Sequence, residues 1–245
     1  MNTTLTTPAP AYAIRPADSR GPTNMGWLNS MHSFSFGHYH DPQRMGYHGL
    51  RVLNDDRVAP GGGFPTHPHA DMEILSWVLD GSLAHKDSTG TVATLPPHTA
   101  QLMSAGSGVT HSEFNGSSEQ PVHFLQIWIE PRERGLTPNY QERPTDTQER
   151  RNAWVALANP DGSHGAAVIQ ADATVRVADV EPGRSVSIEV APGRVAFVHA
   201  ATGQGAVESD ALQAGDAVTV EAPGTLTFTG RGDTPLQLLW FDLPA

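Results

Sequence analysis

Two pairs of potential metal ligands constrain the fold of this chain more than any other feature. His67 and His69 lie two residues apart near the start of the stretch 61–115, and His111 and Glu113 have the same spacing near its end. In a β-strand, side chains two residues apart point to the same face. If the pairs lie on facing strands, three imidazoles and a carboxylate converge on one point. Such N and O donors suit a first-row transition metal, and Fe, Cu, Ni and Mn are all compatible with them.

The residues around these pairs resemble the metal-binding motif of the cupin superfamily. The first part of that motif, Gly-x5-His-x-His-x3-Glu, is matched in order by Gly61, His67, His69 and Glu73. The second part is matched where His111 is followed four residues later by Asn115. The general motif gives the carboxylate ligand as Glu73. Because both glutamates have the right spacing within their strands, geometry alone leaves Glu73 and Glu113 as alternatives.

Longer blocks of the sequence resemble one family of that superfamily, the pirins. These blocks lie within residues 32–131 and read HSFSFGHYHDP, RVLNDDRVAPGGGFPTHPHADMEILSWVLDGSLAHKDS, MSAGSGVTHSEFN and FLQIWIEP. The resemblance implies a single divalent metal held by His67, His69, His111 and Glu113. Glu73 would then be a neighbouring carboxylate that orients a ligating imidazole. Fe(II) is the first expectation for the ion, with Cu, Ni or Mn as alternatives.

The distribution of turn residues predicts an all-β chain. The sequence has 24 glycines and 20 prolines, and short Val, Ile and Leu runs lie between them. Such punctuation is typical of many short strands joined by turns. A length of 245 residues favours two domains. We therefore expect two cupin-type β-barrels in tandem, a bicupin.

The expected domains are a metal-binding barrel over residues 1–131, a charged and proline-broken connector over residues 132–153, and a second barrel over residues 154–245. Aligning VLDGSLAH with AATGQGAV sets Gly81 opposite Gly203. The same alignment places Glu189, Ala191 and Val195 opposite His67, His69 and Glu73. A second alignment, of LPPHTA with LQAGDA, places Phe228 and Gly230 opposite His111 and Glu113. The second barrel is thus predicted to be a degenerate copy without metal ligands.

Charge and composition exclude several classes of protein. Fifteen Lys and Arg against 26 Asp and Glu give a net charge of −11, which argues against direct binding to nucleic acid. The absence of cysteine excludes disulfides and thiolate ligands. No apolar run approaches the roughly 20 residues needed to span a bilayer, and the N-terminus lacks the pattern of a secretory signal. We expect a cytoplasmic protein without membrane association.

The pirin resemblance also implies an activity, quercetin 2,3-dioxygenase, with a flavonol and O2 as substrates. Glu113 would then be both a metal ligand and the catalytic base that accepts the proton of the flavonol 3-hydroxyl. The alternative is a non-enzymatic, metal- and redox-dependent regulator that binds a protein partner. An isomerase or hydrolase acting on another small molecule is a third interpretation. All of them use the same ligands, so the sequence leaves them open.

Overall fold

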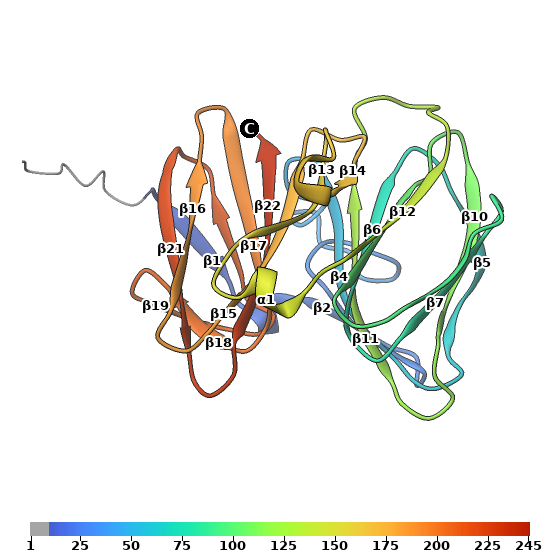
Figure 1. Ribbon diagram of the computed structural model, residues 1–245, viewed down its shortest axis with the longest axis horizontal. Helices are drawn as coiled ribbons and strands as arrows, with labels where there is room; N and C mark the ends of the chain where they lie inside the picture. The colour runs from blue at the N-terminus through green and yellow to red at the C-terminus, as the bar shows by residue number, and fades with distance from the viewer. Residues whose placement is uncertain (1–9) are drawn as a thin grey trace, which may run out of the picture. The chain divides into compact units, whose positions relative to one another are not determined.

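β-strands make up nearly all the regular structure of the computed structural model, which describes residues 10–245 (Figure 1). The chain forms two compact units. The N unit comprises residues 19–146 and 156–173, and the C unit comprises the described residues up to Asp18 together with residues 147–155 and 174–245. Among residues 10–245, no helix has the length and apolar composition required to cross a bilayer. The predicted all-β class is confirmed.

The N unit is built from two antiparallel sheets. The larger sheet has the spatial order β12 (Asn139–Pro144), β9 (Thr99–Ser104), β6 (Glu73–Asp80), β11 (Val122–Ile129), β4 (Leu50–Val58), β3 (Leu28–His32) and β2 (Gly21–Asn24). The smaller sheet has the order β5 (Gly63–His69), β10 (Val109–Asn115), β7 (Leu83–Asp87) and β8 (Val92–Leu95). Apolar side chains pack between them, among them Val78, Leu83, Leu95, Val122 and Phe124.

The burial patterns of the strands explain how the sequence selects this arrangement. β6 is a mostly apolar run whose first six residues are all buried, as expected of a central strand. β10 instead alternates, with His111 and Glu113 buried and Thr110 and Phe114 exposed. An alternating strand has one face toward the interior and one toward solvent. The polar residues at the buried positions of β10 therefore lie inside the N unit.

The C unit repeats this plan. Five of its strands are ordered β1 (Tyr12–Arg15), β20 (Ala217–Val220), β17 (Arg194–Thr202), β22 (Leu236–Pro244) and β15 (Thr174–Val180). Its second sheet is ordered β16 (Ser185–Val190), β21 (Gly224–Arg231), β18 (Gln204–Val207) and β19 (Asp210–Gln213). The run β20-β17-β22-β15 thus corresponds to β9-β6-β11-β4 of the N unit. The tandem cupin architecture is confirmed, although the sheets do not close into complete barrels.

One pair of glycines supports the alignment of the two halves at the turns that contain Gly81 and Gly203. Gly81 and Gly203 both have positive φ, 76° and 80°. A Cβ atom added at Gly81 would lie 2.5 Å from the carbonyl oxygen of Pro121, and one added at Gly203 would lie 2.3 Å from that of Pro235. Both positions therefore require glycine for the same two reasons, backbone conformation and close approach.

The compact units differ from the contiguous domains expected from the sequence. β1 pairs with β20, with Tyr12 opposite Val220, so an N-terminal strand belongs to the C unit. Conversely, residues 156–173, with β13 (Val155–Asn159), η2 (Ser163–Gly165) and β14 (Ala167–Val168), belong largely to the N unit. There the side-chain amide of Gln141 donates to the Val168 carbonyl at 3.0 Å and its oxygen accepts from the Val168 N–H at 2.9 Å.

The predicted connector is also structured rather than a simple linker. β12 pairs with β9 in the N unit, whereas α1 (Thr147–Arg150) lies in the C unit, where buried Arg150 bonds to Asp179 at 3.0 Å. Both differences have one physical cause. A sheet edge has unpaired N–H and C=O groups, and pairing with another segment satisfies them. β12 covers the edge at β9, and β1 covers the edge at β20.

Candidate metal centre

The three predicted histidine ligands come together on two adjacent strands. His67 and His69 lie on β5 and His111 on β10, and His111 is directly opposite His67. Ligand nitrogens of the three imidazoles all lie within 4.8 Å of one another. The ring centroids of His67 and His111 are 4.5 Å apart. The i, i+2 spacing in the sequence thus produces the expected convergence.

The hydrogen bonds of these rings leave lone pairs where a metal would need them. Nδ1 of His67 lies 2.7 Å from the Pro65 carbonyl oxygen, which only accepts, so this nitrogen carries the proton. Nε2 of His67 faces Nε2 of His111 at 3.1 Å, and in the neutral tautomer with Nδ1–H it is Nε2 that has the lone pair. Burial, together with the neighbouring imidazoles, lowers the pKa of His69 to about 4 and that of His111 to about 3. Both rings are therefore neutral at pH 7, the form that binds metals.

Glu113 is held in place by a row of donors on the opposite sheet. Its side chain is buried on β10. Oε1 accepts from Gln101 Nε2 at 2.9 Å, and Oε2 accepts from Gln126 Nε2 at 2.6 Å. Ser76 Oγ lies 3.0 Å from Oε1 and 2.8 Å from Gln126 Oε1, so its one proton serves one of these two oxygens at a time. Ser76 lies opposite Gln101 on one side and Gln126 on the other, so the three residues form one row across the larger sheet. The carboxylate is therefore held at both oxygens.

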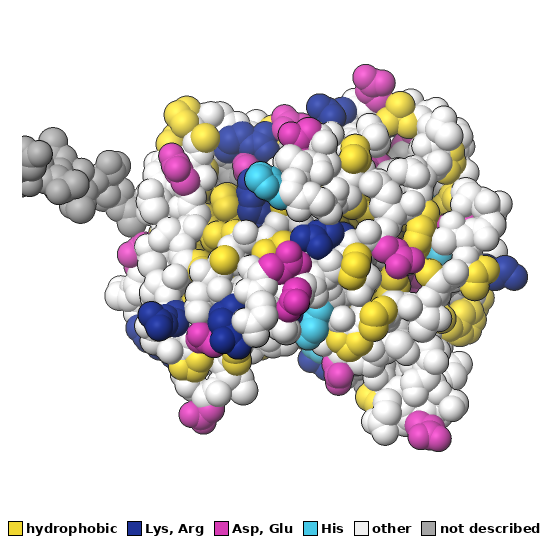
Figure 2. Space-filling model, in the orientation of Figure 1, with side chains coloured by type: hydrophobic (Ala, Val, Ile, Leu, Met, Phe, Trp, Pro, Cys, Tyr) yellow, Lys and Arg dark blue, Asp and Glu magenta, His cyan; other side chains and the backbone are white. Residues whose placement is uncertain are grey.

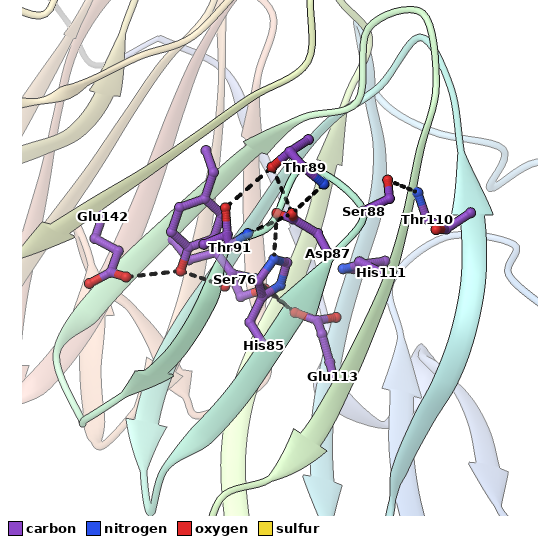
Figure 3. A network of polar contacts seen from close by, with 12 residues as sticks. Ser76, His85, Asp87, Ser88, Thr89, Thr91, Thr110, His111, Glu113 and Glu142 are labelled. Carbon is purple, nitrogen blue, oxygen red and sulfur yellow. Dashed lines mark hydrogen bonds and ion pairs between the residues drawn. The ribbon is translucent and has the colours of Figure 1, made fainter.

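The structure groups Glu113 with a histidine that the sequence analysis did not identify. Ligand atoms of His85, His111 and Glu113 all lie within 4.8 Å of one another. His85 is on β7, directly opposite Glu113. Its Nε2 lies 3.0 Å from Oδ2 of Asp87 (Figure 3). The signal in the sequence was the i, i+2 spacing of His85 and Asp87, which matches that of the two pairs that were identified.

Glu73 has a different role from the one expected. It is buried, and its Oε2 accepts from Ser104 Oγ at 2.9 Å and from the backbone N–H of Gln170 at 3.0 Å. The register of β6 and β9 places Glu73 directly opposite Ser104, in the larger sheet. Burial raises the pKa of Glu73. The sequence analysis expected Glu73 to orient a ligating imidazole. Its observed hydrogen bonds instead connect residues 156–173 with β6 and β9.

An open cavity of about 560 Å³ leads to the histidines. It is lined by Pro68, His69, Ala70, Ser88, Gly108, Val109 and Thr110. His69 also packs edge-on against Trp128, with ring centroids 4.9 Å apart. A volume of this size matches pockets that bind small organic molecules. His69 is therefore the ligand candidate that a molecule in the cavity meets first.

The equivalent face of the C unit is apolar. The buried positions of β16 are Val186, Ile188 and Val190, and Leu226 and Phe228 are buried on β21. Within residues 10–245, both groups of three potential ligands lie in the N unit.

Glu189, which the alignment set opposite His67, points to the exposed face of β16. That alignment is wrong in register, because a slip of one residue moves a side chain to the other face of a strand.

Comparisons with known proteins agree with this architecture. The sequence matches the family model Pirin over residues 14–129 and the model Quercetinase C-terminal cupin domain over residues 156–243. A protein of Escherichia coli (strain K12) named quercetin 2,3-dioxygenase is 39% identical, covering 94% of this chain and 98% of that protein. A pirin-like protein of Caulobacter vibrioides is 36% identical, covering 92% and 97%. The crystal structure of the bacterial pirin YhhW from Escherichia coli in complex with nickel(II) has a TM-score of 0.89 at 35% identity, covering 96% of this chain and 99% of that one.

Proposed function

Because this chain belongs to the pirin family, we propose that its N unit binds one divalent transition metal and acts as a dioxygenase of the quercetin 2,3-dioxygenase type. The observation that carries this proposal is the convergence of His67, His69 and His111 within 4.8 Å beside an open cavity. Glu113 is the fourth proposed ligand. Neutral imidazole and carboxylate donors fit Fe(II), Cu(II), Ni(II) and Mn(II), and the nickel(II) complex of YhhW supports a pirin site of this kind.

The substrate class follows from the cavity and from the relatives. Several relatives are named quercetin 2,3-dioxygenase or putative quercetin 2,3-dioxygenase, which supports a flavonol and O2 as substrates. The neutral ring of His69 lines the cavity and offers an aromatic surface to a planar molecule, and Trp128 packs edge-on against this ring. On the face shown in Figure 2, Lys and Arg side chains are interspersed with Asp and Glu. With a net charge of −11, this distribution supports a small-molecule substrate rather than nucleic acid.

A bound metal would supply a Lewis acid for a substrate hydroxyl oxygen and a centre for dioxygen chemistry. The residues of the chain supply the rest. Glu113 accepts the proton of the flavonol 3-hydroxyl. Gln101 and Gln126 donate to its two oxygens and keep the carboxylate in one position, so little reorganisation is needed as the proton moves. The reaction then opens the central ring of the flavonol with loss of carbon monoxide.

Oxygen consumption tests this proposal directly. Protein loaded separately with Fe(II), Ni(II), Cu(II) or Mn(II), and metal-stripped protein, would be given a panel of flavonols while oxygen and carbon monoxide are measured. We expect consumption and carbon monoxide release with at least one metal and none without metal. If no metal-loaded form consumes oxygen, yet oxidation of the metal changes the affinity for a protein partner, the regulator interpretation replaces the enzymatic one.

A further inference from the structure

The pair formed by His85 and Asp87 has the features of a metal-binding histidine and its supporting carboxylate. Both residues are buried, with 2% and 7% exposure. In Figure 3, His85 lies between Asp87 and Glu113. The antiparallel register of β7 and β10 places Asp87 opposite His111 and His85 opposite Glu113. Directly opposite residues of paired strands point to the same face, so all four side chains share the interior of the N unit.

Asp87 orients the His85 ring. Its Oδ1 accepts from the Thr89 backbone N–H at 2.8 Å, from Thr89 Oγ1 at 2.7 Å and from the Thr91 backbone N–H at 3.1 Å. The other oxygen, Oδ2, lies 3.0 Å from Nε2 of His85. When one imidazole nitrogen donates to a carboxylate, the other is the one that can bind a metal, so this contact assigns metal binding to Nδ1.

This nitrogen is buried without a partner among the described residues. Within the part of the chain that the structure describes, neither Nδ1 of His85 nor Nδ1 of His111 has a hydrogen-bond partner. Both histidines belong to the group in which the ligand atoms of His85, His111 and Glu113 all lie within 4.8 Å of one another. A histidine with only a structural role would have both nitrogens satisfied, because an unpaired buried acceptor costs about 1–3 kcal/mol.

The His85 ring is also held against rotation. Tyr140 packs on it with ring centroids 4.8 Å apart and an interplanar angle of 30°. The Tyr140 hydroxyl lies 3.2 Å from Gln101 Oε1 and 3.0 Å from Glu142 Oε1, so its one proton has an acceptor on either side. With Tyr140 on one face and Asp87 on Nε2, His85 presents Nδ1 in one direction. Ligating histidines typically donate their second ring N–H to a carboxylate in this way.

We propose that His85, His111 and Glu113 form a second, inner metal position in the N unit, which shares His111 and Glu113 with the outer position and replaces His67 and His69 by His85. Two imidazole nitrogens and one carboxylate, all within 4.8 Å of one another, suit a divalent transition ion such as Co(II), Ni(II) or Zn(II). The inner position retains the ion when the outer histidines are unavailable. This proposal rests on metal binding by the N unit, as the proposed function does, but it does not require turnover.

Removal of the outer ligands tests the inner position by metal binding alone. The full-length double variant His67→Ala/His69→Ala would be titrated with Co(II), with binding followed by visible absorption and metal analysis. We expect one Co(II) per chain, bound more weakly than in the parent, with two imidazoles in its X-ray absorption spectrum. Adding His85→Phe should reduce the remaining Co(II) affinity by at least about tenfold, since one of three protein ligands is lost.

His123 provides the matched control. It also pairs with an aspartate, with Nε2 2.7 Å from Oδ1 of Asp55, but it lies outside both ligand groups. His123→Phe in the double-variant background should leave Co(II) affinity unchanged. Absence of Co(II) binding by the folded double variant overturns the proposal. Equal binding with and without His85 overturns it too.

A more conservative substitution covers the case in which His85→Phe fails to fold. In Asp87→Asn the amide oxygen can keep the bonds from Thr89 and Thr91, which turns the amide NH2 toward Nε2 of His85. The imidazole proton then moves to Nδ1 and blocks ligation. We expect Co(II) affinity of the double variant to fall about 10- to 100-fold, whereas unchanged affinity would contradict the proposal. Turnover by the parent protein is measured separately, so failure of one proposal does not imply failure of the other.

Discussion

Replacing Glu113 and Glu73 separately with glutamine distinguishes their roles. In Glu113→Gln, an amide nitrogen at the position of Oε2 meets the Nε2 donor of Gln126, which lies 2.6 Å away. The side-chain amide of Gln126 cannot flip without losing a hydrogen bond, because its oxygen accepts from Ser76 Oγ at 2.8 Å. If the nitrogen instead takes the position of Oε1, it meets Ser76 and Gln101. Either orientation leaves at least one buried donor unpaired.

The cost follows from these contacts. An unpaired buried donor costs about 1–3 kcal/mol, and each remaining bond loses roughly 1 kcal/mol as it changes from charge-assisted to neutral. We expect Glu113→Gln to lower the unfolding free energy of the metal-free protein by about 2–5 kcal/mol. In Glu73→Gln both donors, Ser104 and the Gln170 backbone, still find an oxygen, because both bond to the same atom, Oε2. The expected loss there is about 1–2 kcal/mol.

Urea denaturation of the metal-free variants, followed by competitive Ni(II) titration, measures both effects. Glu113→Gln should weaken Ni(II) binding by at least about tenfold, since it removes an anionic ligand. Glu73→Gln should leave it close to that of the parent. The opposite ranking, with Glu73→Gln losing more metal affinity, would make Glu73 the ligand and exclude Glu113 from that role.

Four further outcomes are expected. Replacing His67, His69 or His111 with alanine should in each case lower Ni(II) affinity by at least about tenfold. Equilibrium dialysis measures this, and full Ni(II) occupancy in all three variants would contradict the assignment of the outer position. His69→Ala should abolish flavonol turnover, whereas His199→Ala, in the C unit, should keep turnover per folded molecule within a few-fold of the parent in the same oxygen assay. At pH 6, an imidazole with an ordinary pKa would release about 0.8 proton when it binds a metal. The pKa values of His69 and His111 are about 4 and 3, so these two rings should release almost no protons. Calorimetric titration in two buffers with different ionisation enthalpies measures the proton release. Burial, with the charges of nearby carboxylates, raises the pKa of Asp56 to about 7. The folded state therefore keeps this proton to higher pH than the unfolded state does, and folding loses stability as the pH rises. From pH 4 to pH 8 the unfolding free energy of the parent, relative to that of Asp56→Asn, should fall by up to about 4 kcal/mol; a constant difference between the two proteins in urea denaturation across this range would contradict it.

The features that the sequence predicted are those set by local periodicity. Two-residue spacing placed His67 and His69 on one face, and His111 and Glu113 on one face of a second strand. The glycines Gly81 and Gly203 were aligned correctly because each lies in a turn with positive φ. Spacing within a strand and turn conformation are local properties, so a single sequence contains them.

The features that were missed depend on pairings between distant segments. Nothing near Tyr12 indicates that its strand pairs with β20 at Val220, because sheet edges accept any segment of suitable length and pattern. Glu73 had the right spacing for a ligand, but the register of β6 places it opposite Ser104 in the larger sheet. His85 became visible only through the register that sets it opposite Glu113.

The two units show which residues the fold needs and which the site needs. The two small sheets have the same strand order, yet the buried face of β16 is entirely Val and Ile, whereas β10 buries His111 and Glu113. Burying polar groups costs free energy unless each is paired, and an apolar face of the same shape avoids that cost. The C unit demonstrates that the fold forms without them. The presence of His111 and Glu113 in the N unit, with Nδ1 of His85 and Nδ1 of His111 without a hydrogen-bond partner among the described residues, supports a role in ligand binding rather than in stability.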